Sequence, residues 1–316
     1  MGGNLWAFVA FNVFVVAMLA LDLGVLHKKE RVIGVKEALG WSAVWIGVAL
    51  AFAVGVYTVK GSQAGIEFVT GYLIEKSLSI DNVFVIVMIF SAFQIDPVHQ
   101  HRVLFWGILG ALVMRAIFIF TGVALISKFH WMLYVFGALL VFTGIKMALP
   151  KSNQKLDPER TLAMRLLKKI IPVTPKLHGS RFFVVEGGRR FATPLFAALL
   201  LVEGTDLIFA VDSIPAILAI TDDPFIVYTS NVFAILGMRS LYFALAGISS
   251  MFRYIHFGLA AVLVFVGTKM VLVDVMKVPA FVSLAIVASL IGASMLASVL
   301  GAKGGTKEEG GPSPTT

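Results

Sequence analysis

Acidic residues recur in the middle of two long apolar segments of this sequence. In the first, GIEFVTGYLIEKSLSIDNVFVIVMIFSAF, Glu75 precedes Asp81 by six positions. In the second, ATPLFAALLLVEGTDLIFAVDSIPAILAIT, Asp206 precedes Asp212 by the same interval, and Glu203 lies just upstream. A carboxylate at bilayer depth costs several kcal/mol unless it faces a polar cavity, a partner or a bound cation. The repeated spacing therefore indicates carboxylates that the protein uses.

Every polar group near these acids offers oxygen as a ligand. An oxygen-only set suits hard divalent cations such as Mg²⁺, Ca²⁺ or Mn²⁺ and disfavours Zn²⁺ and Cu⁺. The sequence has no cysteine, which excludes thiolate metal sites, and its six histidines fall in loops or at predicted membrane edges. No permanent cofactor is expected, and the metal ion would be cargo. The candidate ligands are Glu75, Asp81, Asn82, Glu203, Asp206 and Asp212, with supporting hydroxyls at Ser79, Thr205 and Ser213.

Each of these acids also has a purely structural explanation. Glu75 or Glu203 could lie near a membrane interface and form hydrogen bonds with protein or water. Asp81 and Asp212 lie close to the middle of their apolar runs and recur between the two segments. A ligand role is therefore favoured most strongly for these two aspartates.

Two arginines also lie within apolar segments, Arg115 and Arg239. Each could form a salt bridge with a neighbouring acid that only stabilises the fold. Each could instead neutralise the acids when the cation is absent, which would help the cation to leave. Both arginines are supporting candidates for the site.

The acidic segments open two copies of a longer repeat, which cover residues 66–149 and 192–275. Each copy holds three apolar segments, and self-similarity at a fixed period is the signature of a repeat. Because three crossings reverse the direction of the chain, the copies are predicted to be inverted, related by a pseudo-two-fold axis in the membrane plane. The other matching pieces are Met114-Arg115 with Met238-Arg239, and VFTGIKM (141–147) with VFVGTKM (264–270).

Inverted repeats place a substrate site at the repeat interface near the membrane midplane. On an ideal helix, residues six positions apart point about 240° away from each other. The sequence therefore predicts a bend or break near Ser77–Asp81 and near Thr205–Asp212. If both helices are straight, we expect only one acid per repeat to act as a ligand.

Composition places the chain among polytopic membrane proteins. Of its 316 residues, 59% are hydrophobic and 14% are charged, and the mean hydropathy is +0.92. Since a crossing helix needs about 20 apolar residues, the sequence predicts an all-α fold with about nine transmembrane helices. We place them at 5–26, 38–59, 66–93, 103–127, 131–149, 192–221, 225–251, 255–274 and 279–300.

These helices are expected to form one transporter domain over residues 1–300. Two leading helices (5–59) precede the first repeat, and a last helix (279–300) follows the second. The tail, residues 301–316, is rich in Gly, Pro, Ser and Thr and is predicted to be disordered.

The distribution of charge predicts the orientation. Of the net charge of +8, the loop at 150–191 carries +7, from ten Lys and Arg against three acids. The loop after the first span is also basic, and the positive-inside rule places both in the cytoplasm. We therefore expect a multi-pass protein of the bacterial inner membrane, with its amino terminus outside and its carboxyl terminus in the cytoplasm.

The same basic loop indicates which partners to expect. Its segment DPERTLAMRLLKKIIP (157–172) predicts a short interfacial helix with an apolar face. Lysines and arginines beside a membrane attract anionic lipid, so the charge predicts lipid and no nucleic-acid partner. The sequence leaves the oligomeric state open.

The sequence resembles the TerC family of integral membrane proteins. The resemblance rests on EKSLSIDNVFV (75–85), EGTDLIFAVDSIPA (203–216) and the GIKM/GTKM pair, and it covers about residues 5–300. Members are associated with metal homeostasis, above all manganese efflux, although the family is named for tellurite resistance. The family is similar to a wider group of cation exporters that includes LysE-type proteins. The resemblance implies the same six metal ligands as the residues themselves do.

The function expected from these observations is export of Mn²⁺ from the cytoplasm, with Ca²⁺ or Mg²⁺ as alternatives. Moving two positive charges out of a negative interior costs about 4.6 kcal/mol per 100 mV. No nucleotide-binding motif is present, so ion exchange must supply this energy. Proton antiport fits carboxylates that hold metal and protons in turn, and Na⁺ is the other candidate.

Two other functions compete with transport. The basic loop would also suit a membrane assembly or metal-delivery factor for secreted or membrane proteins. Paired aspartates within spans would suit an intramembrane aspartyl protease, but the Gly-x-Gly-Asp signature of that class is absent. We therefore do not expect an enzyme.

Overall fold

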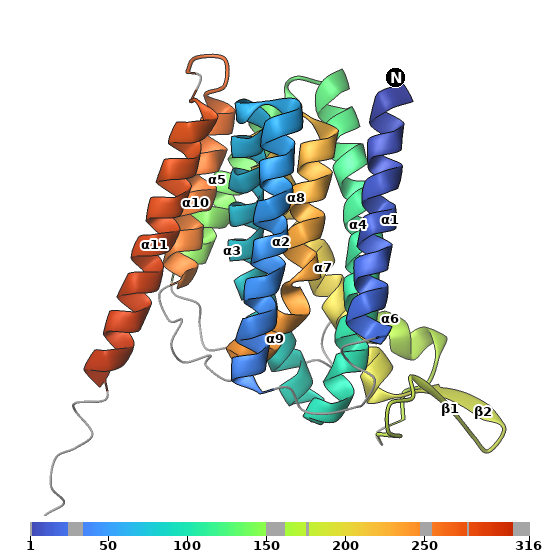
Figure 1. Cartoon of the computed structure of the whole chain (residues 1–316). Coiled ribbons are helices and arrows are strands. Elements are labelled where there is room, and N and C mark those ends of the chain that lie inside the picture. Colours follow the sequence, from blue (N-terminus) through green and yellow to red (C-terminus); the bar gives the residue numbers. More distant parts are fainter. Residues whose placement is uncertain are drawn as a thin grey trace, which may run out of the picture.

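The computed structural model describes residues 2–24, 34–149, 162–174, 177–246, 255–276 and 278–305. Within these ranges the chain forms eleven helices and one two-stranded hairpin. The long helices run side by side as a bundle, with the hairpin at one end of it (Figure 1). The predicted helical membrane class is confirmed.

The helices before and within the first predicted repeat are α1 (Gly2–Gly24), α2 (Val35–Lys60), α3 (Ser62–Ala92), α4 (Pro97–Lys128) and α5 (Met132–Ala148). The connecting region holds α6 (Leu162–Ile170), β1 (Phe183–Glu186) and β2 (Arg189–Ala192). The remaining helices are α7 (Pro194–Leu218), α8 (Pro224–Leu236), α9 (Met238–Ala246), α10 (Ile255–Val271) and α11 (Ala280–Gly305).

Helix length and composition agree with membrane residence. Among the described residues, α2, α4, α7 and the first 21 residues of α11 are long and apolar enough to cross a bilayer. Shorter apolar helices are α5, α8, α10 and the Leu5–Ala20 part of α1. Each of the nine predicted segments coincides with one of these helices, with α3, or with the α8–α9 pair. The number of crossings itself stays a prediction.

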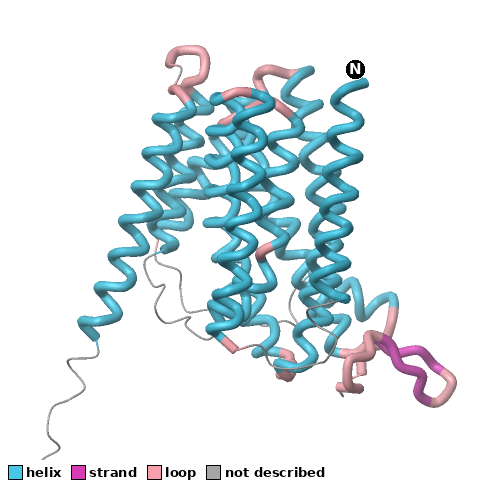
Figure 2. The backbone as a smooth tube through the Cα atoms, viewed as in Figure 1, coloured by secondary structure: helices cyan, strands magenta, loops and turns pink. Residues whose placement is uncertain are grey.

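The two acidic segments contain no break, so the expectation of a broken helix was wrong, whereas a bend within a continuous helix stays a prediction. Helix α3 runs without interruption from Ser62 to Ala92, and α7 runs from Pro194 to Leu218 although Pro215 lies inside it. The interruption lies instead in the seventh predicted segment, where α8 ends and α9 begins around Gly237. A short loop is visible there, inside the bundle at about half its height (Figure 2).

Helices α5 and α10 pack so closely that their backbones meet. A Cβ atom added to Gly137 would lie 2.8 Å from the Gly267 carbonyl oxygen, and one added to Gly144 would lie 2.8 Å from that of Ala260. In the repeat alignment Gly144 corresponds to Gly267 and Gly137 to Ala260. The two contacts therefore exchange when the helices are exchanged, as a two-fold axis between them requires.

Helix α8 lies at the centre of the bundle. All of its side chains from Ile226 to Leu236 are buried. Its Phe233 ring packs against Phe52 of α2, with centroids 4.8 Å apart, and edge-on against Phe68 of α3 at 5.9 Å. Offset and edge-on aromatic pairs add to the burial term, so α8 is held firmly against α3.

The predicted loop at 150–191 contains more structure than the sequence indicated. Met164 and Leu167 of α6 are buried against Ala197 of α7. The apolar face of this helix is therefore partly covered by protein, although Ile170 is 78% exposed. Residues 150–161 lie outside the described residues, and so do 306–316 of the tail. The prediction of disorder was wrong for the first part of the tail, since α11 continues to Gly305.

Candidate functional site

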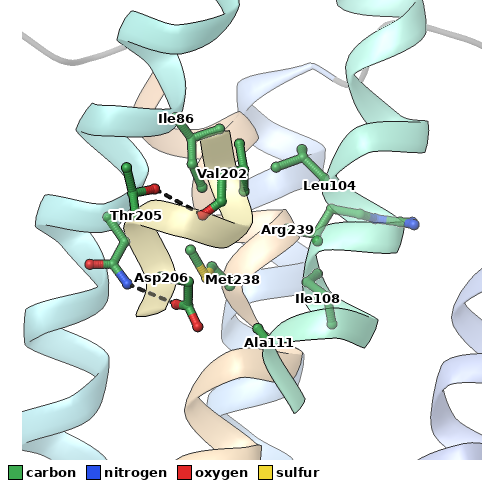
Figure 3. Close-up of a pocket in the computed structure, with 11 residues that line it drawn as sticks. Ile86, Leu104, Ile108, Ala111, Val202, Thr205, Asp206, Met238 and Arg239 are labelled. Carbon is green, nitrogen blue, oxygen red and sulfur yellow. Dashed lines mark hydrogen bonds between the residues drawn. The ribbon is translucent and has the colours of Figure 1, made fainter. Parts of the chain in front are cut away.

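A small cavity opens where α3, α4, α7 and α9 meet, with a volume of about 20 Å³. Figure 3 shows Asp206 and Thr205 on one side of it and the apolar side chains of α4 on the other. A space of this size holds about one water or one small ion. It is lined by Asn82, Ile86, Leu104, Gly107, Ile108, Ala111, Val202, Thr205, Asp206, Met238 and Arg239.

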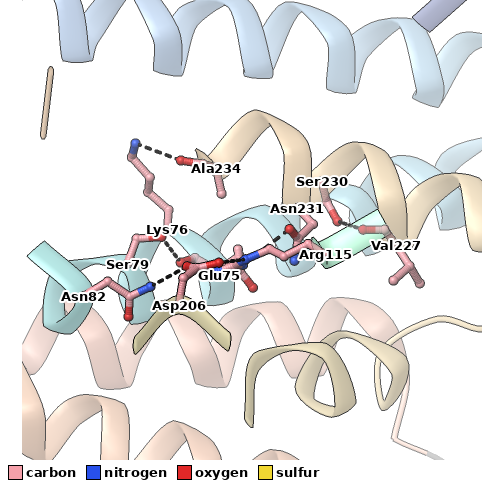
Figure 4. Close-up of polar contacts among 10 residues, drawn as sticks. All are labelled: Glu75, Lys76, Ser79, Asn82, Arg115, Asp206, Val227, Ser230, Asn231 and Ala234. Carbon is pink, nitrogen blue, oxygen red and sulfur yellow. Dashed lines mark hydrogen bonds and ion pairs between the residues drawn. The ribbon is translucent and has the colours of Figure 1, made fainter. Parts of the chain in front are cut away.

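A buried arginine lies beside this cavity and holds acids from both predicted repeats. Arg115 of α4 is 2% exposed. Its Nη2 donates to Asp206 Oδ1 at 2.9 Å and its Nε donates to Oδ2 at 3.2 Å. Nη1 forms an ion pair with Glu75 and lies 3.3 Å from Asn231 Oδ1 (Figure 4). One guanidinium therefore joins α3, α4, α7 and α8.

An amide from the first acidic segment completes this cluster. Asn82 Nδ2 donates to Asp206 Oδ1 at 3.3 Å. The carboxylate of Asp206 on α7 thus accepts hydrogen bonds from side chains of both α3 and α4. The structure brings Glu75, Asn82 and Asp206 together, as the metal-site hypothesis requires.

The charges of this cluster do not balance. With both carboxylates ionised, Glu75 and Asp206 carry two negative charges against the single positive charge of Arg115. Glu75 is 1% exposed, and a buried charge is stable only when it is paired and hydrogen-bonded. The cluster therefore favours one additional positive charge, from a proton or a cation.

Several buried polar atoms around the cluster have no hydrogen-bond partner among the described residues. Buried polar atoms in proteins are nearly always paired, so such a group marks a place for a water or an ion. The atoms are Glu75 Oε2, Asn82 Oδ1, Ser213 Oγ and Asn231 Nδ2. Three of the four are oxygens that can coordinate a hard cation.

A second pocket continues from the cluster toward α5 and α10. It contains the second aspartate of each repeated acidic pair, Asp81 and Asp212, which therefore face the same space. Asp212 Oδ1 also accepts a hydrogen bond from Thr143 Oγ1 of α5 at 3.0 Å. The pocket is lined by Glu75, Leu78, Asp81, Asn82, Arg115, Met147, Phe209, Asp212, Ser213 and Leu263.

Both acidic helices turn the same four positions toward the site. On α3 these are Glu75, Leu78, Asp81 and Asn82, and on α7 they are Asp206, Phe209, Asp212 and Ser213. In each case the spacing is i, i+3, i+6 and i+7. On a regular helix these positions lie within an arc of about 120°.

This arc explains why no break is needed. An angle of 240° between the two acids, measured one way round, is about 120° measured the other way. Leu78 lies between the acids on the α3 arc, and one pocket reaches both Glu75 and Asp81 of that continuous helix. On α7, Phe209 lies between the acids, and Asp206 and Asp212 line two pockets that share Asn82. The expectation that a straight helix can aim only one acid inward is corrected.

The remaining predicted residues lie at the edge of the site or bond to their own helices. Glu203 lies against Gly110 of α4, where it would collide with any added Cβ. The hydroxyls of Ser79 and Thr205 donate to the carbonyls of Glu75 and Val202 in their own helices. Side-chain to backbone bonds of this type satisfy a polar group locally, so these two hydroxyls do not point at the carboxylates.

The arrangement is not a ready metal cage. Across the described ranges, no three His, Cys, Asp or Glu side chains gather closely enough to hold a metal ion. In this conformation the carboxylates of Glu75 and Asp206 are instead bound by Arg115. Arg239 lines the first cavity with Asn82 and Asp206.

Sequence reasoning missed three polar residues of this region. Asn231 of α8 is 0% exposed and touches Arg115. Thr143 bonds to Asp212, and Lys76 lies beside Glu75 but points to α8 (Figure 4). The run Thr229-Ser230-Asn231 within an apolar segment was the available signal for α8, since consecutive polar residues at bilayer depth also need partners.

Comparisons with known proteins identify relatives along most of the chain. The model of the integral membrane protein TerC family matches residues 60–305. An uncharacterized membrane protein, STKORF319 of Myxococcus xanthus, is 58% identical over 283 residues, covering 90% of this chain and 88% of the relative. The "Putative membrane-bound redox modulator Alx" of Escherichia coli (strain K12) is 47% identical over 292 residues, 89% and 90% respectively.

A third relative, an uncharacterized membrane protein of Rickettsia bellii (strain RML369-C), is 43% identical over 280 residues, covering 89% of this chain and 92% of its own. No solved structure matches the chain.

Proposed function

Because this chain belongs to the TerC family of integral membrane proteins, we propose that it is a secondary transporter that exports a hard divalent cation from the cytoplasm. Mn²⁺ is the first candidate, and Ca²⁺ or Mg²⁺ are the others. The observation that carries the proposal is a buried cluster in which two carboxylates from different halves of the chain share one arginine. The membrane is the bacterial inner membrane, with the amino terminus outside.

Arg115 acts in this proposal as a tethered cation. It holds Glu75 and Asp206 while no metal is bound, which keeps two buried acids neutralised. An entering Mn²⁺ takes over these carboxylates, and the guanidinium moves toward Asn231, which it already contacts. When the metal leaves, Arg115 returns and competes against rebinding.

The donor set supports a hard cation. Glu75, Asp81, Asp206 and Asp212 offer carboxylate oxygens, and Asn82 and Ser213 offer neutral oxygens without hydrogen-bond partners in the described structure. Such a set does not by itself prefer Mn²⁺ over Zn²⁺, because raw affinity favours zinc. Selectivity then depends on coordination number and rigidity, so Ca²⁺ and Mg²⁺ compete for transport while Cu⁺ does not.

Proton antiport supplies the energy in this proposal. The carboxylates bind metal at the cytoplasmic face and protons at the outer face, and each cargo displaces the other. Two carboxylates beside a single arginine leave one negative charge to be compensated, so a proton fits the metal-free state. The chain is proposed to have no enzymatic activity.

Some relatives bear a name that refers to redox modulation. For this chain, such an effect would follow from control of a redox-active metal ion. Thiol chemistry cannot produce it, because the sequence has no cysteine.

A membrane assembly or metal-delivery factor is the second candidate function. The observation in its favour is the folded module of α6 and the β1–β2 hairpin, which extends from one end of the bundle (Figure 1). This module could hold a client protein. Co-purification of nascent membrane proteins, lost when the module is deleted, would support this function over transport.

The decisive experiment is a flux assay on purified protein in proteoliposomes, with Mn²⁺, Ca²⁺, Mg²⁺ and Zn²⁺ offered separately. We expect Mn²⁺ flux in the native chain and loss of it in Asp206→Asn. The matched control is Asp223→Asn, which alters an acid paired with Lys60 away from the site. Equal flux in all three proteins, or no flux of any metal, would contradict the proposal.

A further inference from the structure

The interruption between α8 and α9 lies inside the protein. Gly237 separates the helices, and the helical hydrogen bonds resume with Leu241 N–H donating to the Gly237 carbonyl at 3.1 Å. The last four carbonyls of any helix lack partners in that helix. Here the end of α8 is buried, so its carbonyls cannot turn to bulk water.

The carboxyl end of a helix carries a partial negative charge and favours a cation. In discontinuous transmembrane helices, such ends coordinate the coupling ion of a transporter. The break at Gly237 therefore has the chemistry of a position for a monovalent cation. What fills this position decides whether it is available to an ion.

A lysine side chain fills it. Lys76 extends from α3, and its Nζ lies 3.5 Å from the Ala234 carbonyl oxygen in the last turn of α8. Figure 4 shows the side chain directed away from Glu75 and Arg115 and toward Ala234. Within the described residues, no carboxylate forms an ion pair with Lys76. The carbonyl end of α8 is thus its polar contact.

The residue at the break fits the ammonium group. A Cβ atom added to Gly237 would lie 2.6 Å from Lys76 Nζ and 3.2 Å from Trp45 Cβ. Real Cβ atoms do not approach so closely, and glycine leaves this space to the ammonium. The lysine, the helix end and the glycine therefore form one complementary arrangement.

We propose that the carboxyl end of α8 is a monovalent-cation position that the ammonium of Lys76 occupies as a built-in ion. Lys76 acts as a positioning residue that neutralises the end of α8 and keeps the break in place. No free Na⁺ or K⁺ binds there while Lys76 is present. This cation position does not depend on whether the protein transports metal. Its consequence for energy coupling, that a coupling Na⁺ cannot bind at this break, rests on the proposed function.

Thermal unfolding of the purified full chain in detergent tests the position without any Mn²⁺ flux. Lys76→Ala should lower the melting temperature and open the space to a small cation. Methylammonium chloride should then raise the melting temperature by about 2–4 °C in a saturable way, relative to choline chloride at equal ionic strength. Native protein should not respond to methylammonium.

Two variants separate charge from packing. Lys76→Met fills the space without a charge, so it should be destabilised and should not respond to methylammonium. Lys269→Ala removes a lysine of α10 whose Nζ donates to the Ser283 hydroxyl of α11 at 3.1 Å and not to the end of α8, and it should not respond either. A Met variant as stable as the native protein, or an equal response in all proteins, would overturn the proposal.

Gly237→Ala provides an independent measurement. Its methyl group displaces the ammonium, so it should destabilise native protein more than it destabilises the Lys76→Ala variant. Equal effects in both backgrounds would mean that residues 76 and 237 act separately, and the proposal would fail. If Lys76→Ala does not accumulate in membranes, Lys76→Arg should accumulate and Lys76→Met should not. Equal abundance of these two would also overturn it.

Discussion

Arg115 bears on two different quantities, the stability of the empty protein and the affinity of the site for metal. Its guanidinium binds Asp206 through two nitrogens and also pairs with Glu75. Charge-assisted bidentate pairs of this type are among the stronger polar interactions in proteins. The same interactions oppose metal binding, because Mn²⁺ must displace them.

Replacing Arg115 by Met should therefore separate these two effects. The variant leaves the two buried carboxylates without a cationic partner, which costs about 3–5 kcal/mol. Added Mn²⁺ should restore stability and raise the melting temperature more than in the native protein. Arg115→Lys, which keeps the charge, is the control and should respond less. A Met variant with an unchanged melting temperature and no metal response would show that the pairing has neither effect.

Substitutions of Asp81 and Asp212 should affect transport and stability differently from substitutions of Arg115. Asp81→Asn and Asp212→Asn each remove a proposed ligand, and we expect Mn²⁺ export to fall by about 10–100-fold or more. Their abundance in membranes should stay near normal, since removing a half-buried charge also removes its desolvation penalty. Transport per molecule and membrane abundance are the two measurements. A variant that fails to accumulate but transports normally per molecule would make that aspartate structural.

At the scale of the elements, the seam between α5 and α10 is the closest packing. An added methyl at Gly144 or Gly267 would lie less than 3.0 Å from a backbone oxygen of the other helix. Gly144→Ala and Gly267→Ala should each destabilise the protein by about 1–3 kcal/mol, and by similar amounts, because the contacts exchange. Thermal unfolding measures both effects.

The control for the seam is Gly40→Ala in α2, where an added Cβ meets nothing within 4 Å. Alanine favours a helix over glycine by about 0.5–1 kcal/mol, so this variant should be slightly stabilised. Stabilisation of the seam variants by the same amount would show that the two backbones can separate without cost.

The sequence predicted the helices well and their interruptions poorly. Long apolar runs in the sequence predicted where the membrane helices form, because a helix that faces lipid or the protein interior needs apolar side chains. The break depends on contacts between elements: α8 ends at Gly237, where Lys76 and Trp45 lie against the turn. In α7, by contrast, Pro215 produces no interruption. A sequence does not display such contacts between distant segments.

The sequence identified the acids of the candidate site but not the residues that form hydrogen bonds with them. Glu75, Asn82 and Asp206 do come together. The repeated spacing identified the two acids, and Asn82 was chosen as an oxygen ligand beside Asp81. Thr143 could not be found in this way, because a single hydroxyl in an apolar span commonly bonds within its own helix. Asn231 belongs to a polar run in the sequence, but that run does not show which residue it contacts. Their roles follow from which helices become neighbours, which is decided by the whole bundle.

At the scale of the whole molecule, orientation can be tested directly because the sequence has no cysteine. Cysteines introduced one at a time at Lys128, the last residue of α4, and at Gly187, in the hairpin, should be labelled from opposite sides by a membrane-impermeant reagent. The proposed topology places Lys128 outside and Gly187 in the cytoplasm. Labelling of both positions from the same side of intact cells would contradict it.

Energy coupling is also a property of the whole molecule. In inside-out vesicles free of Na⁺, an acidic interior should drive Mn²⁺ uptake, because protons that leave through the transporter exchange for metal. The vesicle exterior should acidify as the metal enters. Mn²⁺ uptake that ignores an imposed proton gradient would exclude proton antiport while leaving the metal site itself untouched.

The seam between α5 and α10 has a mechanical consequence. Two helix backbones in direct contact cannot slide past each other, yet the small residues at the contact allow one helix to tilt against the other. Because Gly137–Gly267 and Gly144–Ala260 lie at different heights along the seam and exchange under the two-fold, tilting one helix about the point between them loosens one contact and tightens the other. The seam can therefore act as a pivot, at which tilting α5 against α10 toward either membrane face costs a similar energy.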